Sequence, residues 1–201
     1  MENIMTAGRN RSFDKDSALE QAMLVFWTNG YPGTSLSDLT NAMDINKSSL
    51  YSTFGNKENL FIQAVDLYSN KYGLVHADEL FKTGKKLPER IRNYLLSIAQ
   101  MITRFDLPTG CLICNSTSEI AGDCLPDNAT KNISAMNQQT VISLTTFFEK
   151  EQHEGNLNEK CSAKTLANYL LTLQFGLAIS ARNGSDMEEL IEVIDFSIGK
   201  F

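Results

Sequence analysis

Residues 34–60 read TSLSDLTNAMDINKSSLYSTFGNKENL and contain signals for two short helices separated by a tight turn. Ser35, followed three residues later by Asp38, is a capping-box-like start for the first helix. Asn46 can cap a second helix over residues 47–54, because its side chain can accept a backbone hydrogen bond there. The stretch therefore predicts a helix, a turn of three or four residues and a second helix.

Helical periodicity extends to both sides of this stretch. Apolar residues recur at three-and-four spacing from Asp14 to Asn29, and a further helix begins at Lys57 and runs toward Tyr72. Later segments of the same kind cover residues 88–105, 128–150, 162–182 and 186–200. No stretch alternates with a period of two for long, so the sequence predicts an all-α fold without internal repeats.

Two short helices joined by a tight turn have helix-turn-helix geometry, in which the second helix lies in the major groove of DNA. Here the second helix, KSSLYSTF, carries short hydroxyls, one cation and no acid. Ser and Thr can donate to phosphates or base edges, Lys47 can neutralise a phosphate, and the Tyr51 hydroxyl can reach the backbone. A solvated connector would have the same composition, so these residues alone leave both interpretations open.

The overall charge limits how such a surface can work. The chain has 201 residues with 42% hydrophobic and 21% charged residues, which is typical of a globular protein. Its net charge of -6 excludes a whole-molecule electrostatic attraction to nucleic acid or anionic membrane. Residues 45–57 hold two lysines and no acids. We therefore expect modest non-specific DNA affinity and binding through a local patch.

The stretch from Ala18 to Tyr68 resembles the DNA-binding domain of the TetR family of bacterial transcriptional regulators. The resemblance covers about a quarter of the chain and holds in order and spacing. It rests on Ala22, Phe26, Gly30-Tyr31, Thr34-Ser35, Leu39, Ala42, Lys47-Ser48-Ser49-Leu50-Tyr51, Phe54, Asn56-Lys57-Glu58 and Leu60-Phe61. It implies an N-terminal three-helix DNA-binding domain over residues 1–60 and a helical effector-binding and dimerisation domain over 61–201, bridged by the helix at 57–72.

The resemblance also implies partners and site residues. The partners are a palindromic double-stranded DNA operator, a small-molecule effector and a second copy of the chain, in a repressor that the effector releases. The DNA-binding residues are Ser35, Ser37, Lys47, Ser48, Ser49, Tyr51, Ser52, Thr53 and Lys57. Family members often have an aromatic residue or His where this chain has Ser52 and Thr53, which predicts weaker base contact there. Arg9 and Arg11 suit either a flexible arm on the phosphates or minor groove of the DNA or a solvated tail.

The second half of the chain offers candidates for an effector site and a dimer interface. By the family plan, we expect a mostly apolar pocket lined by Tyr94, Met101, Phe105, Cys111, Cys114, Asn115, Met136, Phe147 and Phe175. Asn115, Glu119, Gln139 or Gln174 are possible polar contacts for a ligand. The last two helices carry the small residues Ala163, Ala167, Gly176, Ala178 and Ala181, which suit either internal packing or a four-helix dimer interface.

Cys111 and Cys114 form a C-x-x-C motif at the start of a predicted helix. The helix N-terminus can lower the pKa of Cys111, which would suit a redox- or electrophile-sensing regulator, whereas a buried pair would be plain core. A thiol oxidoreductase would need strands around the motif, and none is predicted. We expect no enzyme activity, metal or cofactor. No signal peptide or long apolar span is apparent, so we expect a cytoplasmic protein without a membrane partner.

Overall fold

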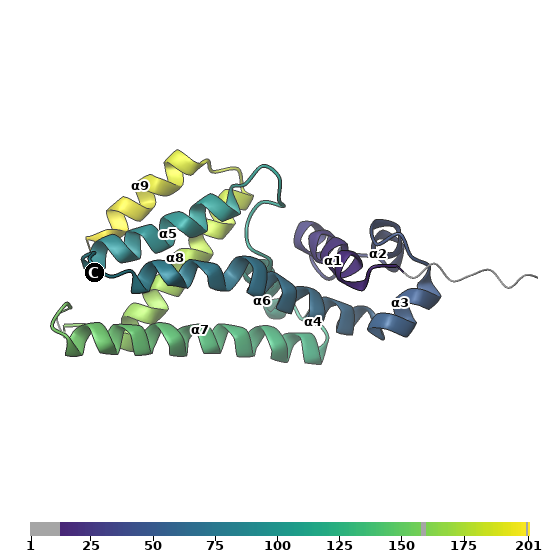
Figure 1. Cartoon of the computed structure of the whole chain (residues 1–201), viewed down its shortest axis with the longest axis horizontal. Coiled ribbons are helices and arrows are strands. Elements are labelled where there is room, and N and C mark those ends of the chain that lie inside the picture. Colours follow the sequence, from purple (N-terminus) through teal and green to yellow (C-terminus); the bar gives the residue numbers. More distant parts are fainter. Residues whose placement is uncertain (1–12, 158–159, 200) are drawn as a thin grey trace, which may run out of the picture.

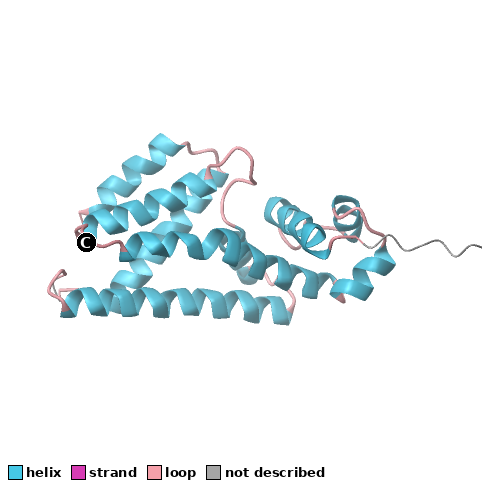
Figure 2. Ribbon diagram, viewed as in Figure 1, coloured by secondary structure: helices cyan, strands magenta, loops and turns pink. Residues whose placement is uncertain are grey.

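The computed structural model describes residues 13–157, 160–199 and 201, so Arg9 and Arg11 lie outside the described residues. Every regular element in these ranges is helical (Figure 2), which confirms the predicted all-α fold. The α-helices are α1 (Lys15–Asn29), α2 (Leu36–Ala42), α3 (Lys47–Phe54), α4 (Lys57–Tyr68), α5 (Leu87–Ile102), α6 (Leu112–Ala121), α7 (Asp127–His153), α8 (Ala163–Arg182) and α9 (Met187–Ile198).

The first helices begin at the residues whose side chains can cap them. Asp14 accepts hydrogen bonds from the first turn of α1, and Ser35 and Asp38 form a reciprocal capping box on α2. Asn46 accepts from the backbone N–H of Ser49 at 2.8 Å and so starts α3. Buried apolar residues from α1 to α4 then hold these helices together; among them are Phe26, Trp27, Leu39, Leu50, Phe54, Leu60 and Phe61.

The chain after α4 differs from the prediction. The helix expected to run to Tyr72 ends as an α-helix at Tyr68 and continues as the π-helical segment η1 (Ser69–Gly73). The 3-10 segment η2 (Leu74–Phe81) follows, where the sequence indicated only a loosened pattern. Burial of Leu80 against the core, with η2 packed on α5, stabilises this segment without α-helical periodicity.

The helices form a small group joined to a larger one. Figure 1 shows α1, α2 and α3 together at one end, with α4 leading from them into the group of α5 to α9. In the larger group α7 packs along α8, and α5 packs against η2 and α9. The predicted helix 88–105 ends at Ile102, where the Ile102 carbonyl accepts a hydrogen bond from Gly110 at 3.0 Å.

Most of the small residues noted in the last two helices serve internal packing. Ala163, Ala167, Ala178 and Ala181 are all buried within the protomer, whereas Gly176 is exposed. The outer faces of α8 and α9 instead present Ile179 and Val193, which are apolar and partly open to solvent. The alanines therefore bring helices together inside one chain.

Candidate nucleic-acid interface and ligand pocket

Helix α3 presents one polar face to solvent. Lys47, Ser48, Tyr51 and Ser52 are exposed and recur at the spacing that places them on the same side of a helix. Leu50 and Phe54, on the opposite side, are buried, and the Tyr51 side chain is 47% exposed although it is aromatic. The helix is thus fixed by its inner side, and its outer side is available to a partner.

The other residues predicted to contact DNA lie around this face and differ in how far they are buried. Ser37 is exposed on α2, whereas Ser49 and Thr53 are half-buried. Ser35 is exposed, but its hydroxyl accepts the backbone N–H of Asp38 at 3.1 Å in the capping box. A hydroxyl that accepts from the backbone can still donate, so capping leaves Ser35 able to contact an acceptor.

Lys57 already has a role within the protein. Its Nζ donates to the Tyr31 carbonyl at 2.7 Å and lies 4.2 Å from the centre of the Tyr31 ring. Burial lowers the pKa of Lys57, although Glu119 and Asp38 oppose the shift. The side chain therefore fastens the start of α4 to the turn after α1.

The same turn is held by residues that are distant in sequence. Glu119 of α6 accepts the Tyr31 N–H through Oε2 at 3.3 Å. Burial raises the pKa of Glu119, while Arg182 and Lys57 act in the opposite direction. Arg182, at the end of α8, donates to the carbonyls of Trp27 and Thr28 at 3.2 and 2.8 Å. The end of α1 is thus bound by both α6 and α8.

Gly30 is required by this arrangement. Its φ of 72° and ψ of 174° are essentially restricted to glycine, and an added Cβ would lie 2.0 Å from Glu119 Oε1. We expect Gly30→Ala to lower the free energy of unfolding by about 1–3 kcal/mol from backbone strain alone. Thermal denaturation should show a fall in Tm of about 2–4 °C for each kcal/mol.

A matched control separates the effect of backbone strain from the effect of the contact with Glu119. Gly84 also has a positive φ, of 79°, but nothing lies within 4 Å of its added Cβ. Gly84→Ala should therefore destabilise the protein less than Gly30→Ala, and Glu119→Ala should recover part of the Gly30→Ala loss. Equal losses for the two glycine variants would show that the contact with Glu119 does not constrain this turn.

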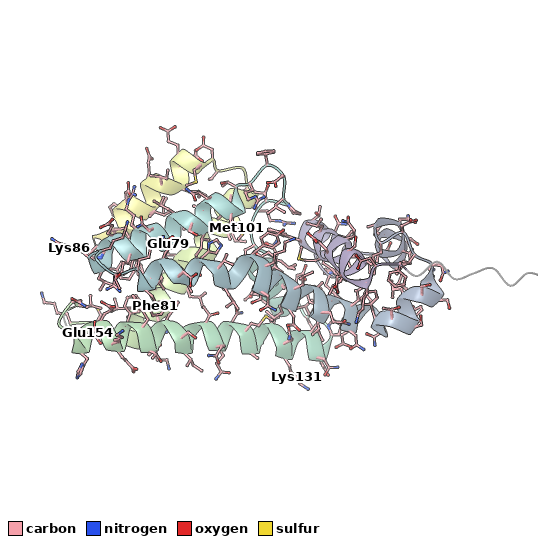
Figure 3. All side chains as sticks on the ribbon, viewed as in Figure 1. Glu79, Phe81, Lys86, Met101, Lys131 and Glu154 are labelled. Carbon is pink, nitrogen blue, oxygen red and sulfur yellow. The ribbon has the colours of Figure 1, made fainter. Side chains whose placement is uncertain are left out.

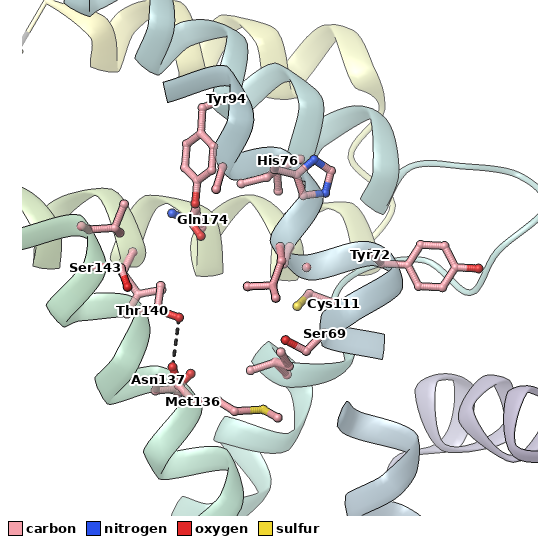
Figure 4. A pocket seen from close by; sticks show the side chains of 18 of the residues that line it. Ser69, Tyr72, His76, Tyr94, Cys111, Met136, Asn137, Thr140, Ser143 and Gln174 are labelled. Carbon is pink, nitrogen blue, oxygen red and sulfur yellow. Dashed lines mark hydrogen bonds between the residues drawn. The ribbon is translucent and has the colours of Figure 1, made fainter. Parts of the chain in front are cut away.

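A cavity of about 400 Å³ lies among the helices of the larger group. Its walls come from α4, η1, η2, α5, α7 and α8, together with the start of α6 (Figure 4). Six of the predicted ligand residues line it: Tyr94, Met101, Cys111, Met136, Phe147 and Phe175. Cys111 and Ile113 bring the N-terminal end of α6 to this cavity, while Glu119 on the same helix holds the turn after α1.

Comparisons with known proteins agree with both parts of this architecture. The family pattern described as "Bacterial regulatory proteins, tetR family" matches residues 18–64. The chain is 35% identical to the HTH-type transcriptional repressor ComR of Escherichia coli (strain K12), over 92% of this chain and 88% of ComR. The chain belongs to the TetR family.

Other relatives extend the likeness over nearly the whole length. This chain is also 31% identical to the uncharacterized HTH-type transcriptional regulator YezE of Bacillus subtilis (strain 168), over 95% of this chain and 97% of YezE. A cysteine mutant of the TetR-family regulator CifR, solved with a 26 bp double-stranded operator DNA, superposes with a TM-score of 0.82 at 30% identity, covering 96% and 100% of the two chains. The prediction of a DNA-binding transcriptional regulator is confirmed.

Three predicted ligand residues of this TetR-family protein are not in the pocket. Phe105 is fully exposed in the loop after α5, because the helix ends before it. Cys114 is buried, and its thiol donates to the Phe175 carbonyl at 3.7 Å. Asn115 also lies away from the cavity, with its buried Nδ2 lacking a partner. Helical spacing predicted the correct helices in two of these cases but not which side faces the cavity.

Of the two interpretations of the C-x-x-C motif, the one with a lowered pKa of Cys111 is contradicted. Cys111 is the N-cap of α6, and its Sγ accepts the N–H of Cys114 at 3.5 Å. Burial nevertheless raises the pKa of Cys111, and it raises that of Cys114 to about 12. Both sulfurs are therefore thiols at neutral pH, which argues against a reactive thiolate. The described residues contain no strand near the motif and no cluster of three or more metal-ligating side chains.

Sequence reasoning missed part of the TetR-family pocket. His76 comes from η2, which the sequence did not predict, and its Nδ1 contacts Ser97 Oγ. Asn137, Thr140 and Ser143 come from α7, where they share a face with the apolar residues that line the cavity. Their three-residue spacing was the available signal, and Gln139, a predicted polar contact, lines the cavity from the same helix. No described helix is long and apolar enough to cross a membrane.

Proposed function

We propose that this regulator is a homodimeric repressor that binds a palindromic operator and releases it when a small molecule occupies the pocket. The observation that carries this proposal is the placement of α6. One end of the helix lines the cavity through Cys111 and Ile113, and Glu119 near its other end accepts the Tyr31 N–H. A ligand that moves α6 would therefore act on the turn that orients α2 and α3.

The DNA-binding side of the proposal uses the exposed face of α3. Lys47, Ser48, Tyr51 and Ser52 would enter the major groove, with Ser49 and Thr53 beside them. Ser35, Ser37 and Lys57 would contact phosphates, which for Lys57 requires a donor beyond the one given to Tyr31. Repression is supported by the relatives ComR and BdcR, both described as HTH-type transcriptional repressors.

The dimer would form through the outer faces of α8 and α9. Gly176 is exposed there with nothing within 4 Å of an added Cβ, and Ile179 and Val193 are partly exposed nearby along the same helices. A two-fold interface would place two copies of α3 on successive half-sites of a palindrome. This assignment divides the chain into a DNA-binding part, residues 1–60, and an effector and dimerisation part, residues 61–201.

The proposed activity involves no catalytic step. It requires reversible binding of DNA and of a ligand, with a coupling free energy between the two sites. A regulator of bacterial operons works where the chromosome is, so the proposed location is the cytoplasm.

Fluorescence anisotropy with DNA from immediately upstream of the protein's own gene tests this proposal. We expect saturable binding of two protomers for each site, with at least 10³-fold preference over random DNA of equal length. Light scattering should give a dimer, and Gly176→Arg should give a folded monomer with reduced affinity. A wild-type monomer that binds the operator fully, or a chain without sequence preference, would contradict the proposal.

A further inference from the structure

The charges of its lining limit what the cavity can bind. Its described lining contains no Asp, Glu, Lys or Arg. Five titratable groups line it: Tyr68, Tyr72, His76, Tyr94 and Cys111. Burial lowers the pKa of His76, raises that of Tyr68 and of Cys111, and raises that of Tyr94 to about 12, so these four groups are held in their neutral forms. An ionised ligand would lose its hydration and gain no opposite charge in this cavity.

Polar groups are nevertheless concentrated on one wall. Asn137, Thr140 and Ser143 lie on successive turns of α7 and face the cavity in Figure 4. Asn137 donates its Nδ2 to Thr117 Oγ1 at 2.9 Å, and Thr140 donates to the Met136 carbonyl at 3.0 Å. The Asn137 carbonyl oxygen and the Thr140 lone pairs keep capacity to accept, and the Ser143 hydroxyl can donate.

The side of the cavity formed by α5 and α8 adds one unused donor. Gln174 lies beside Tyr94, whose hydroxyl is directed toward the Gln174 amide in Figure 4. The buried Nε2 of Gln174 has no hydrogen-bond partner. Most other lining side chains are apolar, including Ile98, Leu144 and Phe147. The cavity thus has a polar edge along α7, a donor at Gln174 and apolar faces between them.

We propose that the effector is an uncharged molecule with an apolar, ring-sized body and hydroxyl or carbonyl groups along one edge, bound with that edge on Asn137, Thr140 and Ser143. This inference rests on the proposed function, since it assigns the ligand class of the same cavity. Volume supports a compact molecule, because about 400 Å³ is at the lower end of small-molecule sites.

Two fluorescent probes with one skeleton test the charge requirement. N-phenyl-1-naphthylamine is uncharged, and 8-anilino-1-naphthalenesulfonate carries the same rings with a sulfonate. Titration of the full-length dimer should show saturable binding of the uncharged probe and roughly hundredfold weaker binding of the sulfonate, because the sulfonate would be buried without a counter-charge. Equal or tighter binding of the sulfonate, or no binding of either probe, would overturn the proposal.

A charge introduced on the polar edge locates the site. Thr140→Lys should reverse the preference, so that the sulfonate binds more tightly than the uncharged probe. Thr146→Lys makes the same change on α7 at an exposed position outside the lining and should leave the preference unchanged. Circular dichroism should show that both variants are folded. An unchanged preference in Thr140→Lys would place the probes elsewhere and overturn the assignment.

The polar edge has its own test with two uncharged competitors of similar size. 1-Naphthol should displace N-phenyl-1-naphthylamine more effectively than 1-methylnaphthalene, by up to roughly tenfold for one additional hydrogen bond at this partly buried edge. Asn137→Leu should reduce that difference. Equal displacement by both competitors in the wild-type protein would overturn the role of the α7 edge.

Operator affinity measured in the same samples separates this inference from the proposed function. Probe selectivity as expected, with unchanged operator affinity, would support the ligand class and count against ligand-induced release. Loss of selectivity together with release from the operator would overturn the ligand class and leave the regulatory mechanism standing.

Discussion

Replacement of both Lys47 and Tyr51 by alanine should reduce operator affinity more than any other change on the DNA-binding side. Both side chains are exposed on the outer face of α3, which leaves them available to the groove or the phosphates. Each such contact is worth about 1–3 kcal/mol, so the double variant should bind at least a hundredfold more weakly. Because Leu50 and Phe54 hold α3 from its inner side, the fold should be retained.

Salt dependence distinguishes a phosphate contact from a structural effect. Lys47→Ala should reduce the slope of log affinity against log salt by about 1 for each protomer, whereas Tyr51→Ala should leave the slope nearly unchanged. Lys164→Ala removes the same charge from an exposed position at the start of α8 and should change neither affinity nor slope. Wild-type affinity and slope in the double variant would rule out α3 as the reading helix.

Glu151→Ala should produce the largest loss of stability. Arg90 donates to both oxygens of Glu151, at 2.9 and 2.5 Å, and both side chains are largely buried. Removal of the carboxylate leaves the guanidinium buried without its counter-charge, which typically costs about 3–5 kcal/mol. Arg90 also donates to the Leu80 carbonyl at 2.8 Å, so the variant should loosen η2 where Leu80 and Phe81 line the cavity.

Chemical denaturation of paired variants measures this contribution. Glu154, labelled in Figure 3, is the exposed C-cap residue of α7, three residues after Glu151. It lies 3.8 Å from Lys150. Glu154→Ala makes the same chemical change and should lower the free energy of unfolding by no more than about 1 kcal/mol, since exposed ion pairs contribute little to stability. Similar denaturation midpoints for the two variants would mean that the ion pair between Arg90 and Glu151 does not stabilise the fold.

Several features could be predicted from local sequence because local chemistry decides them. Helices α1 to α3 begin at Asp14, Ser35 and Asn46, where a side chain can satisfy free backbone N–H groups. Helix α3 could also be predicted, since its apolar residues recur at helical spacing and its polar residues lie on the other side. Residues 45–57 contain two lysines and no acids, which predicted the DNA-binding surface despite the net charge of -6 for the whole chain.

Other features depend on contacts between distant segments. The pKa of Cys111 is set by burial rather than by the helix N-terminus, and Phe105 is exposed because its helix ends three residues earlier. The segment η2 forms because it packs on α5, and no local pattern predicts that. Lys57 was predicted to contact phosphate, and only its proximity to the Tyr31 carbonyl showed that it also fastens a turn.

The sequence by itself determined the helical class, the position of helix α3 and the family, because capping, periodicity and motif spacing act within a few residues. Only the tertiary structure decided which side of α7 faces the cavity and that the described residues lining it include no Asp, Glu, Lys or Arg. It also showed that α6 connects the cavity to Gly30 and Tyr31. These properties depend on which residues distant in sequence are brought together, and burial then sets their charge and their hydrogen bonds.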